Sequence, residues 1–346
     1  MFFKKKIKKN NPYVIAEIGV NHECSIKMAK KLIDLAVEGG AHAAKFQTYK
    51  AEKLASKNSP AYWNIKKEKT LSQYKLFKKF DKFNYSHYRE LYFYCKKKKI
   101  EFASTPFDEE AVNFLNPFLK FFKIASADIN NLPLLKEIAK KKKPVIISTG
   151  ASFIKEVKFA ESFLKKHGCP EVVIMHCILN YPTIDKNANL NMIKDIKKIF
   201  PKNIIGYSDH TAPDDNMLNL TVAFLFGAKI IEKHFTDNKQ KKGNDHYHSM
   251  NKKDLKNFFL NIERIKNIQG SSEKKPIKSE FLSRKNARRS IVLKKNLRKG
   301  CIIEPEMLIT KRPGTGITPD NWKKVIGKKL NKNLSEDHIL KWRDLK

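Results

Sequence analysis

The sequence predicts an α/β protein, a (β/α)8 TIM barrel followed by a small second domain. Between residues 13 and 266, short runs rich in β-branched residues alternate with segments whose apolar residues recur at helical spacing. Strands that alternate with helices are typical of right-handed βαβ units and a parallel sheet. Eight such units within about 250 residues match the size of a (β/α)8 barrel.

Eight runs are the candidate strands of this barrel. They are Val14–Ile18, Ala43–Thr48, Glu101–Thr105, Phe121–Ser126, Val145–Thr149, Val172–Cys177, Ile204–Ser208 and Ile230–Phe235. Helical spacing is clear at Ile26–Glu38, Leu132–Lys140, Ile154–Lys166 and Asn216–Phe226. The segment Lys50–Tyr85 interrupts the alternation, and we expect a long loop with a short helix there.

The chain after the barrel has a different character. We assign residues 1–267 to the barrel, 268–285 to a linker with Gly, Ser, Pro and mixed charges, and 286–346 to a compact second domain. A strand is expected at Ser290–Leu293, and short helical turns at Pro305–Leu308 and Pro319–Val325. A domain this small has little core of its own. We therefore expect it to dock, with a partner subunit as a candidate.

The charge is strongly positive, with 71 Lys+Arg against 35 Asp+Glu and a net charge of +36. Such a balance could recruit nucleic acid or another polyanion. The lysines are nevertheless spread along the whole chain, and no nucleic-acid-binding motif accompanies them. We favour a compositional bias and predict no nucleic-acid partner, although the charge should speed the arrival of anionic substrates.

Cysteine use and hydropathy predict a cytoplasmic protein. The five cysteines are odd in number and have no CxxC spacing, which is typical of reduced thiols in the cytosol. The start MFFKKKIKKNNP lacks the apolar stretch of a signal peptide. The longest apolar run, Leu220–Ala228, is too short to span a bilayer, so no membrane association is expected.

Polar side chains follow every predicted strand, where active sites of (β/α)8 barrels lie. His210 in SDH and His234 in EKH end two consecutive strands, and two imidazoles there could hold a divalent metal with open positions for substrate. Two hydrogen-bonded structural histidines would have the same spacing. The paired motifs favour the metal.

A second group of donors suits an anion. It combines ammonium and hydroxyl groups that would converge on a phosphate or carboxylate, namely Lys45, Lys123, Thr105, Ser126, Ser148 and Ser208. Each hydroxyl taken alone is more often a strand end or a helix cap. Lys123 lies inside the apolar run FLKFFKIAS, where a buried ammonium needs a partner.

Single candidates complete the predicted site. Glu17 could act as an acid, a base or an acceptor for a sugar hydroxyl, and an ion pair with a lysine is the alternative. Asp245 would lie on the loop after the eighth strand, where an ordinary turn aspartate is equally compatible. Arg312 in the second domain is a surface arginine or a bidentate clamp. His246 and His248 are expected in a loop.

Longer motifs carry a family resemblance that covers roughly residues 13–346. They are VIAEIGVNHECS, AAKFQTYKAEKL, FASTPFDEEAV, FFKIASADINNLPLL, VIISTGAS, HCILNYPT, IGYSDHT and EKHFTDNKQKKGNDHYHSM. As a set they resemble the N-acetylneuraminate (sialic acid) synthase family. The tail ARRSIVLKKNLRKG followed by KRPGTGI is similar to the C-terminal SAF (antifreeze-like, β-clip-like) domain of that family.

The resemblance implies a domain-swapped homodimer that condenses phosphoenolpyruvate with an N-acyl hexosamine such as N-acetylmannosamine, using a divalent metal such as Mn²⁺ or Mg²⁺. The matching metal ligands are His210 and His234. The matching phosphoenolpyruvate contacts are Lys45, Thr105, Ser126, Ser148 and Ser208. The groups matching positions near the sugar are Glu17, Lys123, Tyr181 and Asp245, with Arg312 inserted from the partner subunit. Glu17, Lys45 and Lys123 are the catalytic candidates.

Four positions depart from the sialate pattern. Cys24 stands where a Gly is common, and Asp128 replaces a Glu expected to touch the sugar. Leu179 stands where some members have a substrate-contacting Asn, with Asn180 one place later, and Asn244 replaces a Pro. Legionaminate and pseudaminate synthases share the framework and use diacetamido sugars, so the acceptor stays open.

Two further classes are alternatives. One is a non-catalytic polyanion-binding protein built on a basic barrel. The other is a keto-deoxy sugar phosphate synthase, which needs additional basic residues for its sugar phosphate and lacks the C-terminal domain.

Overall fold

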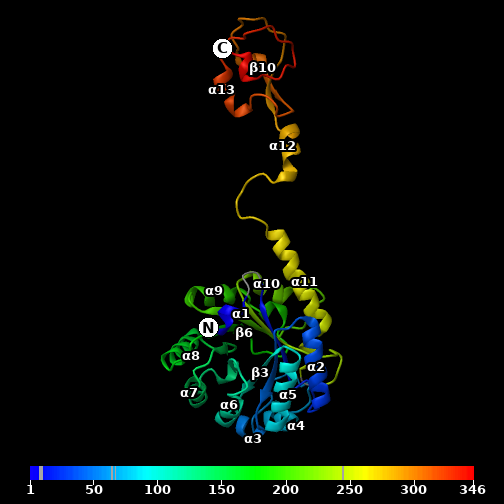
Figure 1. The fold of residues 1–346 in the computed structure, drawn as a ribbon, viewed down its shortest axis with the longest axis vertical. Coiled ribbons are helices and arrows are strands. Elements are labelled where there is room, and N and C mark those ends of the chain that lie inside the picture. The colour runs from blue at the N-terminus through cyan, green and yellow to red at the C-terminus, as the bar shows by residue number, and fades with distance from the viewer. Residues whose placement is uncertain (8–10, 64, 67, 244) are drawn as a thin grey trace. The chain divides into compact units, whose positions relative to one another are not determined.

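The computed structural model describes residues 1–7, 11–63, 65–66, 68–243 and 245–346. The chain divides into two compact units, Met1–Ile268 and Gln269–Lys346 (Figure 1).

The first unit is a parallel (β/α)8 barrel, as predicted. In the described part of the chain its strands are β1 (Tyr13–Gly19), β2 (Ala43–Thr48), β3 (Glu101–Pro106), β4 (Phe122–Ile124), β5 (Val145–Ser148), β6 (Val172–Cys177), β7 (Ile204–Asp209) and β8 (Ile230–His234). The ladder runs in the order β3-β2-β1-β8-β7-β6-β5-β4. Strands β3 and β4 pack against each other and complete the ring.

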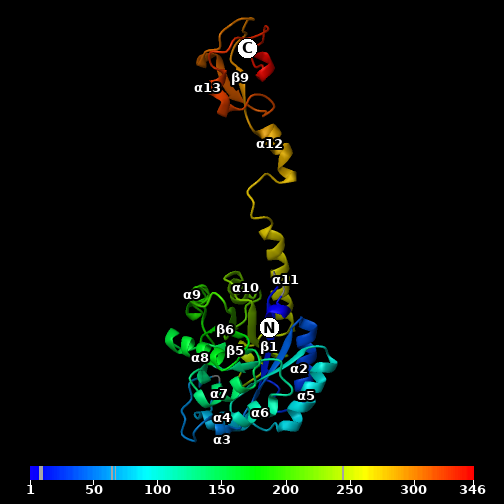
Figure 2. The same cartoon turned by 60° about the vertical axis from the view of Figure 1, so that its left-hand side comes forward.

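Helices surround the strands in Figures 1 and 2. They are α1 (Phe2–Lys6), α2 (Ile26–Gly39), α3 (Ala51–Leu54), α4 (Gln73–Phe80), α5 (Tyr85–Lys97), α6 (Glu109–Leu115), α7 (Leu132–Lys140), α8 (Ile154–Lys166), α9 (Asn191–Ile199), α10 (Leu218–Leu225) and α11 (Lys252–Gln269). Helix α2 shows why they form: the Ser25 side chain accepts a hydrogen bond from Met28 N at its start, and Gly40 at φ +94° ends it. Its Leu32, Ile33 and Ala36 are fully buried.

Alternation along the strands separates an outer apolar layer from the barrel interior. Towards the amino ends of the strands, the interior is filled by a cluster that includes Ile15, Phe121, Val173 and Ile230. Helix α1 belongs to this end, since Phe3 is fully buried in the same cluster. In both views α1 lies at one end of the strands, and α3 and α4 lie at the other (Figures 1 and 2).

A few boundaries differ from the sequence prediction. Strand β4 stops at Ile124, because the chain turns into a 3-10 helix at Ser126–Asp128. The segment Lys50–Tyr85 holds two helices, α3 and α4, where one was expected. Helix α10 is shorter at both ends than predicted. Among the described residues, no helix is long and apolar enough to cross a membrane.

The second unit contains α12 (Phe281–Ala287), β9 (Ser290–Leu293), β10 (Leu308–Lys311) and α13 (Trp322–Val325). Strands β9 and β10 pair antiparallel. Despite its size, the unit has an apolar cluster of its own, in which Ile291, Leu293, Ile303, Val325 and Leu340 are fully buried. Helix α12 begins within the segment that the composition marks as a linker.

Candidate active site

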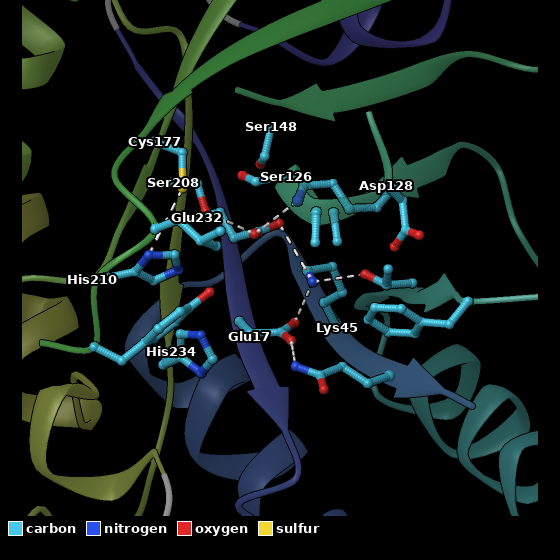
Figure 3. Close-up of a pocket in the computed structure, with 18 of the residues that line it drawn as sticks. Glu17, Lys45, Ser126, Asp128, Ser148, Cys177, Ser208, His210, Glu232 and His234 are labelled. Atoms are coloured by element: carbon cyan, nitrogen blue, oxygen red, sulfur yellow. Dashed lines mark hydrogen bonds and ion pairs between the residues drawn. The ribbon is translucent and has the colours of Figure 1, made fainter. Parts of the chain in front are cut away.

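A cavity of about 450 Å³ opens at the carboxyl ends of the barrel strands (Figure 3). Eleven of the fourteen residues predicted for the site line it. They are Glu17, Lys45, Thr105, Lys123, Ser126, Asp128, Ser148, Tyr181, Ser208, His210 and His234.

Strand periodicity brings these side chains together. Successive inward positions on β8 are Ile230, Glu232 and His234, so the apolar cluster gives way to ionisable groups along one strand. The same change occurs on β1 between Ile15 and Glu17. Register then aligns the strands, because Glu17 pairs with His234 on one side and with Lys45 on the other.

Lys45 lies between two carboxylates. Its Nζ is 2.7 Å from Glu17 Oε2 and 3.7 Å from Glu232 Oε2, and it donates to Thr105 Oγ1 at 3.0 Å. Burial alone would lower the pKa of Lys45, but Glu17 and Glu232 raise it above its ordinary value. Lys45 is therefore a stable buried cation that faces the cavity.

Lys123 has fewer charge partners. Its Nζ lies 3.3 Å from Glu232 Oε1, which also accepts from Ser208 Oγ at 3.1 Å. Burial lowers the pKa of Lys123 below its ordinary value. Burial works against ionisation of Glu232 as well, yet Lys123 and Lys45 lower the pKa of Glu232 to about 2. Glu232 is thus the carboxylate that Lys45 and Lys123 share.

Glu17 is the carboxyl group with the opposite shift. Burial raises its pKa above the ordinary value, although the Lys45 ammonium opposes the change. Gln47 Nε2 donates to its Oε1 at 2.9 Å and holds the side chain in place. A raised pKa suits a group that exchanges protons near neutral pH.

Ser126 and Ser148 add two further hydroxyls to the cavity lining. Ser126 Oγ accepts from Gly150 N at 2.9 Å. Ser148 is 2% exposed, and its Oγ has no hydrogen-bond partner among the described residues. An unpaired buried hydroxyl in the cavity lining is a donor ready for an anionic ligand.

His210 and His234 face each other across the cavity mouth, with ring centroids 5.5 Å apart. The Nδ1 of His210 donates to Ile178 O at 2.7 Å, which leaves its Nε2 with a free lone pair. His234 Nδ1 lies 3.2 Å from Asp245 Oδ2. Burial would lower the pKa of His234, but Asp245 and Glu17 raise it.

This donor set fits a divalent ion. A histidine fixed by a carbonyl and another fixed by a carboxylate is the usual arrangement of imidazole ligands. Burial also opposes ionisation of Asp245, yet His234 holds the pKa of Asp245 well below its usual range. Asp245 itself lies behind His234, outside the cavity lining.

The remaining predicted residues fall into different places. Asp128 lines the cavity, accepts from Asn131 Nδ2 at 3.2 Å, and has a pKa raised by burial. Tyr181 packs on His210 with ring centroids 4.2 Å apart. Asn180 is exposed and outside the lining, whereas Leu179 lines the cavity. Arg312 belongs to the second unit. Asn244 lies outside the described residues.

Sequence reasoning missed some residues of the site. Glu232 is not among the predicted site residues, although it lies two positions before His234 and therefore faces the same interior. Cys177 also lines the cavity, with Sγ 3.8 Å from His210 Nδ1. His248 was expected in a loop, but it is fully buried in a 3-10 helix at His246–His248.

The chain matches two family models. The NeuB family model covers residues 32–274, and the SAF domain model covers residues 288–346. The chain belongs to the NeuB family.

Several relatives of this NeuB-family chain are named synthases. It is 39% identical to the N,N'-diacetyllegionaminic acid synthase of Legionella pneumophila, over 95% of this chain and 93% of that protein. It is 31% identical to the N-acetylneuraminate-9-phosphate synthase of Homo sapiens, over 95% and 91%. Among solved structures it resembles the N-acetylneuraminic acid synthetase of Leptospira borgpetersenii, with 33% identity, a TM-score of 0.69, and 79% and 90% coverage.

Proposed function

We propose that this chain is a nonulosonate synthase, which condenses phosphoenolpyruvate with an open-chain N-acylated aminohexose and releases phosphate. The observation that carries the proposal is the pairing of buried Lys45 and Lys123 with Glu232 in one cavity beside His210 and His234. Cations and hydroxyl donors on one side suit the phosphate and carboxylate of phosphoenolpyruvate. Imidazoles on the other side suit a polarised carbonyl. NeuB-family membership supports the same reaction.

The reaction forms one carbon–carbon bond and breaks one carbon–oxygen bond. The methylene carbon of phosphoenolpyruvate attacks the sugar aldehyde carbon, and the aldehyde oxygen becomes a hydroxyl group by taking a proton. Water adds to the cationic enol carbon that results and loses a proton. The tetrahedral product collapses to a ketone, and phosphate leaves with the bridging oxygen. Lys45 and Lys123 hold the anionic groups and stabilise the charge on the leaving phosphate.

Glu17 is the group proposed to accept a proton from the attacking water. Its carboxyl is buried next to Lys45 and fixed by Gln47. A raised pKa makes it a better base than an ordinary glutamate. It would then pass this proton to the phosphate as the carbon–oxygen bond breaks.

A divalent ion such as Mn²⁺ or Mg²⁺ is part of the proposal, with His210 and His234 as its protein ligands. Bound there, such an ion supplies a Lewis acid for the aldehyde oxygen. Ile178 O and Asp245 hold the two rings through their Nδ1 atoms, which leaves the Nε2 atoms to face the acceptor.

A diacetamido sugar is a second candidate for the acceptor, and the structure offers an observation that favours it over N-acetylmannosamine. Asp128 lines the cavity where the sialate pattern has a Glu, and a side chain shorter by one methylene leaves room for a larger substituent. Identity is also higher to a legionaminic acid synthase, at 39%, than to an N-acetylneuraminate-9-phosphate synthase, at 31%.

A domain-swapped homodimer is proposed to complete the site. In this arrangement Arg312 of one chain reaches the sugar bound in the barrel of the other. Its planar guanidinium suits the N-acyl carbonyl or a carboxylate.

The test is phosphate release from phosphoenolpyruvate with a panel of acceptors, namely N-acetylmannosamine, 2,4-diacetamido sugars and a sugar phosphate. We expect release only with non-phosphorylated N-acyl sugars, and ¹⁸O from labelled water should enter the sugar and not the phosphate. Release with the sugar phosphate alone would favour the keto-deoxy sugar phosphate class. Absence of release with every acceptor, together with salt-sensitive binding to nucleic acid or heparin, would favour the polyanion-binding alternative.

A further inference from the structure

His248 is a buried imidazole that the reaction does not use. Its side chain is fully buried, and neither Nδ1 nor Nε2 has a hydrogen-bond partner among the described residues. A buried polar group without a partner costs about 1–3 kcal/mol, so native proteins rarely keep one without a reason.

The surroundings of His248 point to a cation. Its ring centroid lies 4.8 Å from that of His234 and 6.3 Å from that of His210. Ligand atoms of His234, Asp245 and His248 all lie within 4.8 Å of one another, and the three residues are buried. Imidazoles held in place by a neighbouring carboxylate are typical of zinc sites and of other transition-metal sites.

The backbone holds His248 in this position. Met250 N donates to His234 O at 2.8 Å, and Thr236 N donates to Met250 O at 2.9 Å, which ties the segment to the end of β8. Next to His248, Ser249 Oγ donates to Asp245 O at 2.5 Å and accepts from the Asn21 side chain. The imidazole is therefore preorganised in the apoprotein.

The neighbouring His246 shows the contrast. It is also buried, two residues earlier in the same 3-10 helix. Its Nδ1 bonds with Thr236 Oγ1 at 2.8 Å, and its Nε2 lies 3.4 Å from Glu23 Oε1. Both nitrogens of His246 are thus occupied by protein groups, which leaves His248 as the member of this pair that is available as a ligand.

We propose that His248 binds the same divalent ion as His234, with Asp245 as the carboxylate that holds His234 in place, so that this chain has a nitrogen-rich metal site that prefers Zn²⁺, Co²⁺ or Fe²⁺ to Mg²⁺. Imidazole donors favour the later transition metals, whereas water and carboxylate oxygens suit Mg²⁺. The inference deepens the metal part of the proposed function and rests on it. It adds a ligand to the His210 and His234 pair, and it changes which metal should be found in the site.

The experiment measures metal binding without substrate. The full chain is freed of metal by a chelator and titrated with Co²⁺, and separately with Mg²⁺, by equilibrium dialysis and visible absorption. We expect one Co²⁺ per chain, and His248→Ala should weaken Co²⁺ binding by about tenfold or more with little effect on Mg²⁺. The matched control His246→Ala should keep the affinity and the spectrum. Unchanged Co²⁺ affinity and spectrum in His248→Ala would overturn the proposal.

A second variant distinguishes loss of the metal ligand from loss of the fold. In His248→Cys a thiolate replaces the imidazole, and Co²⁺ should then give a sulfur-to-cobalt charge-transfer band in the near ultraviolet. A variant that melts like the wild type and binds Co²⁺ without this band would also overturn the proposal. These readouts need no condensation. Suppose that the wild-type enzyme condenses sugars and that His248→Ala binds the metal as the wild type does. This result would refute the role of His248 as a ligand and would leave the proposed synthase function intact.

Discussion

The ammonium of Lys123 lies 3.3 Å from Oε1 of Glu232, and both side chains are almost fully buried. With Lys45 on its other oxygen, Glu232 acts as the resident counter-ion of the anion site. A phosphate or carboxylate that enters the cavity must share these cations with it.

Glu232→Gln should destabilise the chain without substrate and make it more responsive to ligand. Removing one partner of a buried ion pair costs about 3–5 kcal/mol, because the other charge is left uncompensated. Phosphoenolpyruvate should then raise the thermal midpoint more in the variant than in the wild type. Glu263→Gln is the control, since its pair with Lys266 is at the surface and contributes little. If phosphoenolpyruvate raised the thermal midpoint of Glu232→Gln and of the wild type by the same amount, the counter-ion role of Glu232 would be wrong.

Lys123→Met should weaken phosphoenolpyruvate binding. A hydrogen bond to a charged group contributes about 1.5–3 kcal/mol, so the KM for phosphoenolpyruvate should rise roughly ten- to a hundredfold. Steady-state kinetics at saturating acceptor measure the effect. Lys120→Met serves as the comparison, because Lys120 is an exposed lysine on the same segment and should leave the KM unchanged. If only the KM for the acceptor rose, Lys123 would bind the sugar and not phosphoenolpyruvate.

Glu17→Gln should lower kcat by roughly 10²–10⁴-fold, the usual contribution of a general base. Burial raises the pKa of Glu17, so its carboxylate form is lost at a higher pH than for an ordinary glutamate. The wild-type rate should therefore be at its maximum above this raised pKa and should fall as the pH drops through it. The variant should lack this acidic limb. A low rate with the limb retained would assign the titration to another group.

Asp128→Glu should shift acceptor preference towards N-acetylmannosamine. The longer side chain fills the space next to the sugar and brings its carboxylate closer to a hydroxyl. One methylene in a pocket changes discrimination by about 1–3 kcal/mol, so the ratio of kcat/KM values should change roughly 10–200-fold. Competition between the two sugar types measures it. The variant Asp195→Glu, on α9 and exposed, should keep the wild-type ratio.

Mixed dimers test whether Arg312 acts on the partner barrel. His234→Ala and Arg312→Ala chains should each be inactive alone. If the arginine comes from the other subunit, one site in each mixed dimer combines intact groups, and co-refolding equal amounts should restore about a quarter of wild-type activity. If Arg312 serves its own barrel, mixing should restore nothing.

Much of the barrel could be predicted from local pattern. The bounds of β2 and β6, and those of α7 and α8, coincide with their predicted ranges, because each has a clear apolar period and a clear end signal. Strand β4 was predicted too long, since Ala125 and Ser126 carry no local signal for the 3-10 turn that follows. Such a turn depends on neighbouring loops and not on the strand itself.

The site was predictable as a collection of strand ends, and less so as a set of contacts. Lys45 and Lys123 were recognisable as cations in apolar runs, but their shared partner Glu232 comes from a strand far away in the sequence. The partnerless nitrogens of His248 are likewise a property of packing. Two neighbouring histidines in a loop segment look alike in sequence. Only the tertiary structure shows that, among the described residues, the ring nitrogens of His246 have polar partners and those of His248 have no hydrogen-bond partner.

Helix α1 has a practical consequence for anyone who handles this protein. Phe3 is fully buried against Tyr13 and Phe121, and Glu171 accepts hydrogen bonds from the backbone of Phe3 and Lys4. These first residues close the end of the barrel remote from the cavity. Trimming them, or placing a bulky affinity tag directly before them, would let water reach the apolar interior. Purification tags are better fused through a flexible spacer, so that helix α1 can pack against the end of the barrel.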